Sequence, residues 1–440
     1  MALKKLFFLI IVLSFIIPLA YSFYFRIHPS VDARAYDNIA YNLASGRGYR
    51  ESLDIPLEMD YSLVRVGPGY EFFLAGLYYI FGHRYWPVWI VQSLLQALAA
   101  VLTFLIAKEI FKKNWDPKIG LVAAAFVGFS PDLITISAML LSETLAIFLV
   151  LLSVYLFFKY YSQKKLFLIL ALGAVFGFTA LVRTPVFLLL IPFFIFLIKN
   201  KRWLHISLLV LTIFFIFLPW SLRNYKIYHK FIPTNAALGY NLVAGNHSGA
   251  SGELEPYLPL SENFKKLGPI KTGEIAQKEA LQFIFAHPLE FIKVTLYRIS
   301  MYFSFARPTG FWPYLSGLNK IITLIVSSFY AFLLFTAGFI GISQIKKIEK
   351  EDRKKVLYFL SMLVLMPLGI IWIVVETRYR FLIYPFLAIF SGYACLCLRA
   401  GWLRIKSLSL LISSIFILNT IFDAARNFPR ILERLLEIHF

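Results

Sequence analysis

Long apolar segments alternate with short basic ones along most of the chain. A helix needs about 20 predominantly apolar residues to cross the hydrocarbon core of a bilayer. Eleven segments of 14 to 22 residues, rich in Leu, Ile, Val and Phe, come close enough to be predicted as spans. They are 6–25, 86–107, 118–131, 143–160, 166–182, 185–198, 203–220, 321–342, 355–375, 381–398 and 408–424. The pattern predicts an all-α polytopic membrane protein with about 11 transmembrane helices, within a range of 10–13.

A further apolar segment, 67–82, has 16 residues and contains Pro68 and Glu71. If it spanned the membrane, the orientation of every later span would be reversed. If it does not, five Lys/Arg-rich short loops face the cytoplasm, while the short turns opposite them hold one basic residue, Arg183. The basic loops are 108–117, 159–165, 199–202, 343–354 and 399–407. This positive-inside pattern predicts a cytoplasmic N-terminus and makes 67–82 a juxtamembrane or re-entrant helix.

Two long segments then lie on the extracytoplasmic side, 26–85 and 221–320. With no Gly/Ser linker, low-complexity tract or internal repeat, residues 1–440 are predicted to form one membrane domain with these two elaborated loops. Juxtamembrane helices are expected in both loops, and an amphipathic tail over 425–440. A cleaved signal peptide is the alternative for the first span, because Ala20-Tyr21-Ser22 offers small residues.

Composition agrees with a lipid environment. The chain is 59% hydrophobic and 15% charged, whereas a soluble domain carries about 25% charged residues. This excludes an ordinary soluble enzyme, a disordered protein and a disulfide-stapled secreted module. The net charge of +20 fits anionic lipid headgroups at the membrane better than nucleic acid.

Polar residues collect at the predicted outer ends of the spans, where they are costly and usually functional. They are Asp32, Asp37, Arg65, Asp132, Glu143, Arg183, Arg223, Asn224, Asn246, His247, Glu376, Arg378 and Arg380. Arginine presents a planar fork of donors that suits phosphate oxygens, so Arg183, Arg223, Arg378 and Arg380 are the phosphate candidates. Local Glu–Arg pairing and snorkelling at the interface are the alternative for 376–380.

Two carboxylates are the candidates for chemistry. Asp32 precedes a predicted amphipathic helix over 33–45 that Gly46 closes, so it either caps that helix or serves as a general base. Glu143 opens a span, where it either complements the helix dipole or faces Asp32 across an outer cavity. Asp37 is expected to be structural or solvated, and Asp132 to be a turn residue.

The loop 239–252 is rich in Gly and Asn but lacks the Lys and the strand–loop–helix context of a nucleotide-binding loop. No Cys/His spacing typical of a metal site accompanies His28 or His247. Cys395 and Cys397 are two apart in an apolar segment, so a disulfide between them is not expected.

Six segments together resemble the polytopic glycosyltransferases of the C superfamily, especially the group of protein O-mannosyltransferases and the lipid A aminoarabinose transferase. They are VDARAYDNIAYNLASGRGY, RVGPGYEFFLAGLYYIFG, VQSLLQALAAVLTFLIAKEIF, SPDLITISAMLLSETLA, PWSLRNYKIYHKFIPTNAALGYNLVAGN and ETRYRFLIYPFLA, in the order of the family. The resemblance implies an inverting transfer of a sugar from a polyprenyl-phosphate donor to a hydroxyl acceptor, on the extracytoplasmic face. Many members carry two adjacent acids in the first loop, where this chain has Asp32 followed by Ala33.

The resemblance assigns catalytic roles to Asp32 and Glu143. Binding of the donor phosphate and sugar is expected from Tyr36, Arg65, Arg183, Arg223, Asn246, Glu376, Arg378 and Arg380. The lipid tail is expected in a groove beside 67–82, under a closing loop at 239–270. No cofactor is certain, and both a divalent metal ion and the oligomeric state are left open.

Two other classes of function compete with this one. A transporter or flippase of lipid-linked sugars would favour inverted repeats and polar groups at the midplane, neither of which the sequence shows. A non-catalytic membrane scaffold would not depend on a single carboxylate.

Overall fold

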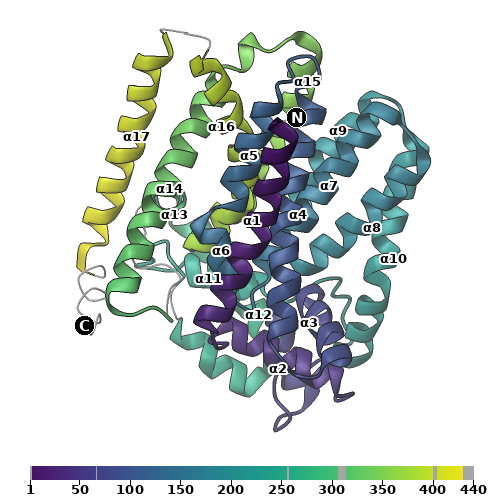
Figure 1. Cartoon of the computed structure of the whole chain (residues 1–440). Helices are drawn as coiled ribbons and strands as arrows, with labels where there is room; N and C mark the ends of the chain where they lie inside the picture. The colour runs from purple at the N-terminus through teal and green to yellow at the C-terminus, as the bar shows by residue number, and fades with distance from the viewer. Residues whose placement is uncertain (1, 66, 255–256, 306–313, 400–403, 430–440) are drawn as a thin grey trace.

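The chain folds into a bundle of helices (Figure 1) in a computed structural model that describes residues 2–65, 67–254, 257–305, 314–399 and 404–429. Within these residues there is no β-strand, and one isolated bridge joins Glu253 to Val375. The all-α class predicted from the sequence is confirmed. The predicted tail over 425–440 lies outside the described residues from 430 onward.

Among the described residues, eight helices are long and apolar enough to cross a membrane. They are α1 (Ala2–Phe25), α4 (Trp86–Ile110), α7 (Glu143–Gln163), α10 (Trp203–Tyr228), α14 (Gly317–Ser343), α15 (Lys350–Ile371), the run of η5 (Thr377–Ile383) with α16 (Tyr384–Arg399), and α17 (Arg404–Arg426). A ninth is formed if α5 (Pro117–Gly128) and α6 (Pro131–Ser137), which are bent by 51°, count as one span. The chain is therefore a multi-pass membrane protein.

The two remaining predicted spans are shorter apolar helices. One is α8 (Leu166–Val182), and the other is η3 (Thr184–Leu189) continued by α9 (Leu190–Lys199). All eleven predicted segments are thus helical, although length and composition alone qualify only eight or nine of them as spans. The predicted segment 118–131 is interrupted because Ser130 and Pro131 begin a new helix, with the Ser130 hydroxyl accepting from the Leu133 amide.

Close helix packing at glycines builds the core around α16, which is the most deeply buried of the spans. A Cβ on Gly392 of α16 would lie 2.2 Å from the Ile119 carbonyl oxygen of α5. A Cβ on Gly341 of α14 would lie 2.0 Å from the Phe390 carbonyl oxygen. Small residues let helix backbones approach in lipid, where there is little hydrophobic drive for association.

Five further helices are neither spans nor the shorter apolar helices α8 and α9, and most of them lie toward the end of the bundle opposite the N-terminus, at the bottom of Figure 1. They are α2 (Asp32–Ala44), α3 (Pro68–Phe81), α11 (Leu238–Gly245), α12 (Leu258–Ala286) and α13 (Pro288–Phe303), with the short turns η1 (Leu57–Met59) and η2 (Tyr61–Val64). Helix α2 packs on α3, and α11 packs on α12. The helices predicted at 33–45 and 67–82 are confirmed as α2 and α3.

Two acids near this end hold the helices together. Asp37 of α2 accepts hydrogen bonds from Tyr78 (2.6 Å) and Tyr85 (2.8 Å), with His83 also at 2.8 Å, which confirms its structural role. Asp132 is not a simple turn residue. It is buried in the first turn of α6 and accepts a hydrogen bond of 2.7 Å from the Tyr384 hydroxyl.

Glu71 in α3 is fully buried, and burial raises the pKa of its carboxyl group from 4.5 to about 8, although Tyr49 and Arg65 favour the ionised form. Between these two values the folded chain holds a proton that the unfolded chain releases. Stability therefore falls as the pH rises from about 4.5 to about 8, by up to about 1.4 kcal/mol per pH unit.

We expect Glu71→Gln to remove this loss of stability with rising pH, because the glutamine amide stays neutral from pH 4.5 to pH 8. Thermal unfolding measured from pH 5 to pH 8 should have a flatter pH dependence in this variant than in the wild type. Glu58→Gln, at an exposed glutamate of the same loop, should keep the wild-type slope. An equal slope in all three proteins would contradict the assignment.

Candidate active site

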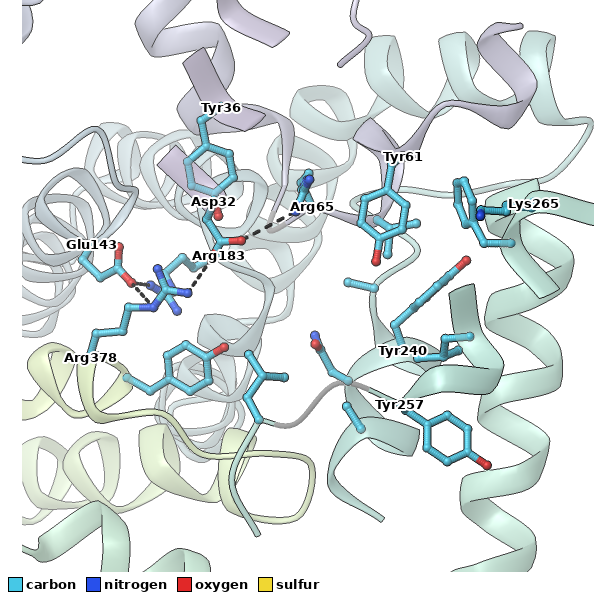
Figure 2. A pocket seen from close by; sticks show the side chains of 18 residues that line it. Asp32, Tyr36, Tyr61, Arg65, Glu143, Arg183, Tyr240, Tyr257, Lys265 and Arg378 are labelled. Carbon is cyan, nitrogen blue, oxygen red and sulfur yellow. Dashed lines mark hydrogen bonds and ion pairs between the residues drawn. The ribbon is translucent and has the colours of Figure 1, made fainter. Parts of the chain in front are cut away.

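A cavity of about 680 Å³ opens at this end of the bundle, between α2, α7, α11, α12 and η5 (Figure 2). We call it the site cavity. Its lining includes six of the ten predicted site residues, Asp32, Tyr36, Arg65, Glu143, Arg183 and Arg378. These six come from segments up to 346 residues apart. The cavity therefore brings together one carboxylate-and-guanidinium cluster that the sequence disperses.

Asp32 is the first residue of α2, and its carboxylate contacts guanidinium groups rather than the amides of its own helix. Arg378 Nη2 lies 2.5 Å from Asp32 Oδ2, and Arg65 Nη1 lies 3.6 Å from Oδ1. The alternative in which Asp32 only caps the helix is therefore wrong. A quarter of its side chain (25%) remains exposed, so the carboxylate is accessible from the cavity.

Partial burial raises the pKa of Asp32, but the neighbouring positive charges of Arg378, Arg65 and Arg183 outweigh it. The net result is a pKa below the ordinary value of 3.8. Asp32 is therefore ionised at neutral pH and can accept a proton.

Glu143 begins α7 and lies behind the arginines, with only 2% of its side chain exposed. Its Oε1 is 2.7 Å from Arg183 Nη1 and 3.6 Å from Arg378 Nε. Arg378 thus links Asp32 and Glu143, which face each other across its guanidinium group (Figure 2). A charge buried this deeply needs a partner of opposite sign. Glu143 is that partner for both Arg183 and Arg378.

The local pairing predicted within 376–380 is present, since Arg378 Nε donates to Glu376 Oε2 at 2.7 Å. Snorkelling is not, because the Arg378 side chain is 9% exposed and extends toward Asp32 instead. Tyr379 lines the cavity beside it, with its ring centroid 5.3 Å from the Arg183 guanidinium carbon.

Four predicted site residues lie outside the lining of the site cavity. Glu376 reaches it only through Arg378. Arg223 donates to the Tyr49 carbonyl oxygen at 2.9 Å. Arg380 is buried against Tyr384 and the Ser304 carbonyl oxygen, and Asn246 lies at the end of α11. Arg223 and Arg380 therefore support the surrounding structure and do not reach the cavity.

The opposite half of the cavity is largely aromatic, and no sequence motif marks its residues. Figure 2 shows Tyr61, Tyr240, Tyr257 and Lys265 on this side, and Phe264 also lines it. Tyr61 packs edge-on against Phe264, with ring centroids 4.8 Å apart. The sequence pointed to this side of the cavity only through the predicted closing loop at 239–270. That segment forms α11 and the first turns of α12, which provide most of the aromatic half.

Arg298 of α13, also missed from the sequence, is fully buried and ties α11 to α15. It donates to the carbonyl oxygens of Ile371 (3.3 Å), Trp372 (3.2 Å) and Gly245, and to Asn246 Oδ1 (3.1 Å). These acceptors lie at the C-terminal ends of two helices, where a cation is favoured. Arg298 thereby fixes the segment that leads into Glu376 and Arg378.

We expect Arg298→Met to lower the free energy of unfolding by about 2–3 kcal/mol, because the buried carbonyl groups lose a charged donor. Thermal or denaturant unfolding of the purified protein measures this. Lys293→Met, at an exposed cation of the same helix, is the matched control and should be near neutral. Equal stabilities of the two variants would show that Arg298 does not fix these helix ends.

The donor set of the site cavity does not fit a divalent cation. In the part of the chain that the structure describes, no three His, Cys, Asp or Glu side chains are placed so that they could hold one metal ion together. Both carboxylates of the cavity, Asp32 and Glu143, are paired with arginines, whose charge would repel a second cation. The residues instead suit an anion brought close to Arg183 and Arg378.

A second cavity, of about 190 Å³, adjoins the first between η3 and α15. The two cavities share Arg183, Ala237, Asn241 and Tyr379. The second continues along a mostly apolar wall that includes Pro185, Leu238, Gly369, Ile370, Ile373 and Val374. The start of α3, by contrast, packs tightly on α8, since a Cβ on Gly69 would lie 2.7 Å from Val182 Cγ2. The cavity that adjoins the site thus lies beside η3 and not beside 67–82, where the lipid groove was expected.

Comparison with known proteins agrees with this architecture. Residues 65–222 match the family model described as dolichyl-phosphate-mannose-protein mannosyltransferase. The crystal structure of the oligosaccharyltransferase of Archaeoglobus fulgidus with zinc and sulfate matches over 95% of this chain and 52% of its own, at 14% identity and a TM-score of 0.50. Its apo form matches over 96% and 56%, at 12% identity and a TM-score of 0.51.

The chain has the fold of this oligosaccharyltransferase. The resemblance drawn from the sequence is confirmed at this level. The chain spans about half the length of the oligosaccharyltransferase that it matches. ArnT from Cupriavidus metallidurans, bound to undecaprenyl phosphate, is also similar, at 15% identity over 88% of this chain and 77% of that one, with a TM-score of 0.41. No curated protein sequence matches the chain.

Proposed function

We propose that the chain is an inverting glycosyltransferase that moves a sugar from a polyprenyl-phosphate donor to a hydroxyl acceptor. The observation that carries the proposal is an accessible, ionised carboxylate, Asp32, held beside two buried arginines in a cavity at one end of a membrane bundle. The matched family model, whose name includes a dolichyl-phosphate-linked mannose donor, supports the class of donor.

Asp32 acts as the general base. The acceptor oxygen attacks the anomeric carbon, the bond from that carbon to the phosphate oxygen breaks, and the hydroxyl proton passes to Asp32. A low pKa is compatible with this role, because the attacking hydroxyl becomes strongly acidic only as its new bond forms. The transition state has oxocarbenium character, as in other glycosyl transfers.

The leaving group is the lipid phosphate, which gains a negative charge as the bond breaks. Arg183 and Arg378 stabilise this charge from positions that Glu143 fixes in advance. The second cavity takes the first isoprene units, because its mostly apolar wall begins at Arg183. The aromatic half of the site cavity then faces the sugar and the acceptor.

The different accessibility of the two acids supports inversion. A double displacement with net retention needs a second carboxylate in reach of the anomeric carbon as the nucleophile. Glu143 is 2% exposed and lies behind the arginines, so Asp32 is the one acid of the pair that is open to the cavity. A single displacement, and therefore inversion, is the mechanism that this arrangement supports.

The orientation in the membrane is part of the proposal. The predicted cytoplasmic loops carry most of the basic clusters, and the site cavity lies among the segments predicted to be extracytoplasmic. We therefore propose an extracytoplasmic active site and a cytoplasmic N-terminus, in a cell membrane. Cysteine accessibility labelling at position 32 and within 199–202 should give labels on opposite sides.

The deciding experiment supplies purified protein with a polyprenyl-phosphate donor whose sugar carries a radiolabel, with and without a chelator. The expected result is transfer of label to a hydroxyl acceptor with inverted anomeric configuration, and little change on chelation. Movement of the intact donor across a vesicle membrane, with its sugar–phosphate bond preserved, would instead support a flippase. Neither transfer nor hydrolysis with any donor tested would support a scaffold.

A further inference from the structure

A third cavity, of about 630 Å³, lies at the other end of the bundle, where α7 and α9 end and α15 begins. We call it the lysine groove. Its lining combines three lysines with aromatic and aliphatic side chains, which are Tyr161, Lys164, Pro192, Ile195, Phe196, Lys199, Asn200, Lys354, Leu357, Tyr358 and Ser361. Figure 1 shows α9 and α15 meeting near the N-terminus, away from α2 and α3.

The three lysines of the groove place positive charge around it. Lys164, Lys199 and Lys354 are exposed, and none of them takes part in the ion pairs found among the described residues. Two acids of this end are already engaged, Glu109 by Lys159 (2.5 Å) and Glu351 by Lys113 (3.8 Å). The groove is therefore a concentrated positive site around a concave surface.

An aromatic floor lies under these lysines. Phe196 is buried, and Tyr161 stacks on it with ring centroids 4.6 Å apart. Tyr358 meets Phe196 at 6.0 Å with its ring at right angles. Ile195 and Leu357 are exposed at the edge of the groove, where a membrane span would contact acyl chains. The site thus offers cations to a headgroup and apolar surface to the chains attached to it.

We propose that the lysine groove binds one anionic phospholipid. The phosphate lies among the ammonium groups of Lys164, Lys199 and Lys354, and the upper acyl chains lie along the aromatic floor toward Ile195 and Leu357. Basic pockets between membrane helices select anionic headgroups in this way, each lysine adding to the attraction. A choline headgroup would bring its own cation against the lysines, so a zwitterionic lipid fits less well.

This proposal is independent of the proposed activity, because the groove and the site cavity have no lining residue in common. They are nevertheless built on the same long helices. Helix α7 begins at Glu143 in the site cavity and ends beside the lysine groove, and α15 runs from the groove to the second cavity.

Native mass spectrometry of the detergent-purified full chain, titrated with palmitoyl-oleoyl phosphatidylglycerol or the matching phosphatidylcholine, tests the proposal. The wild type should retain one phosphatidylglycerol, with at least ten-fold preference over phosphatidylcholine. The triple variant Lys164→Gln, Lys199→Gln and Lys354→Gln should lose most of this preference, with affinity for phosphatidylglycerol at least ten-fold lower.

The matched control is Lys165→Gln, Lys201→Gln and Lys350→Gln, which removes three exposed lysines from the same end of the bundle but none from the lining. It should bind phosphatidylglycerol like the wild type. Equal losses in both triple variants would overturn the proposal, because the attraction would then be diffuse. Equal binding of the two lipids by the wild type would overturn it as well. Displacement of the lipid by glycerol phosphate at comparable concentration would show that the groove recognises a free phosphate and not a lipid.

Discussion

We expect Asp32→Asn to lower sugar transfer by about 10³-fold in kcat/KM in a purified, correctly folded protein. General base catalysis contributes about 10²- to 10⁴-fold, and the amide cannot accept the acceptor's proton. The amide also contributes no charge to the contacts with Arg378 and Arg65. Transfer of a labelled sugar measures the loss, and Asp54→Asn, at an exposed acid of the same loop, is the matched control.

The pH dependence offers a second measurement on Asp32. Burial raises its pKa but the arginines lower it further, so the base form persists as the pH falls. We therefore expect kcat/KM to show no acid limb assignable to Asp32 between pH 7 and pH 5. In Arg65→Gln, where one of the positive charges is removed, the acid limb should move to higher pH.

Near-normal transfer by Asp32→Asn would show that another group accepts the proton.

Arg378→Gln is expected to impair both stability and transfer, because this guanidinium contacts Asp32, Glu143 and Glu376. Removing one partner from a buried ion pair costs about 3–5 kcal/mol, since the remaining charge stays buried. Loss of a positioned donor to the leaving phosphate adds about 10²- to 10³-fold in kcat. Unfolding measurements and the transfer assay separate the two effects.

A double variant distinguishes catalysis from stability. Arg378→Gln with Glu143→Gln leaves no uncompensated Glu143 carboxylate, so part of the lost stability should return while transfer remains low. Arg34→Gln, at an exposed arginine of α2, should change neither property. Recovery of transfer along with stability would show that Arg378 has only a structural role.

The spans and the two acids could be predicted from the sequence because the governing effects are local. A bilayer requires long apolar helices, whatever their neighbours are, and the eleven predicted segments are helical. A carboxylate at the end of an apolar segment is unusual wherever the segment packs. Asp32 and Glu143 were identified on this ground and by resemblance, and both line the site cavity.

The roles of the arginines could not be predicted in the same way. Arg378 and Arg380 are two residues apart in η5, where successive side chains point in different directions. One therefore enters the cavity, and the other is buried against Tyr384 and Ser304. Arg223 also lies at the predicted outer end of a span, but it donates to the Tyr49 carbonyl oxygen and does not line the cavity.

The sequence by itself determined a multi-pass helical protein with acids and arginines at one end of its spans, because hydrophobicity and charge act segment by segment. The tertiary structure decided which of these groups meet. It joined Asp32 to Arg378 across 346 positions of the chain, added an aromatic wall from α11 and α12, and opened an apolar cavity between η3 and α15. These features depend on the rotation and packing of distant helices, which no local pattern encodes.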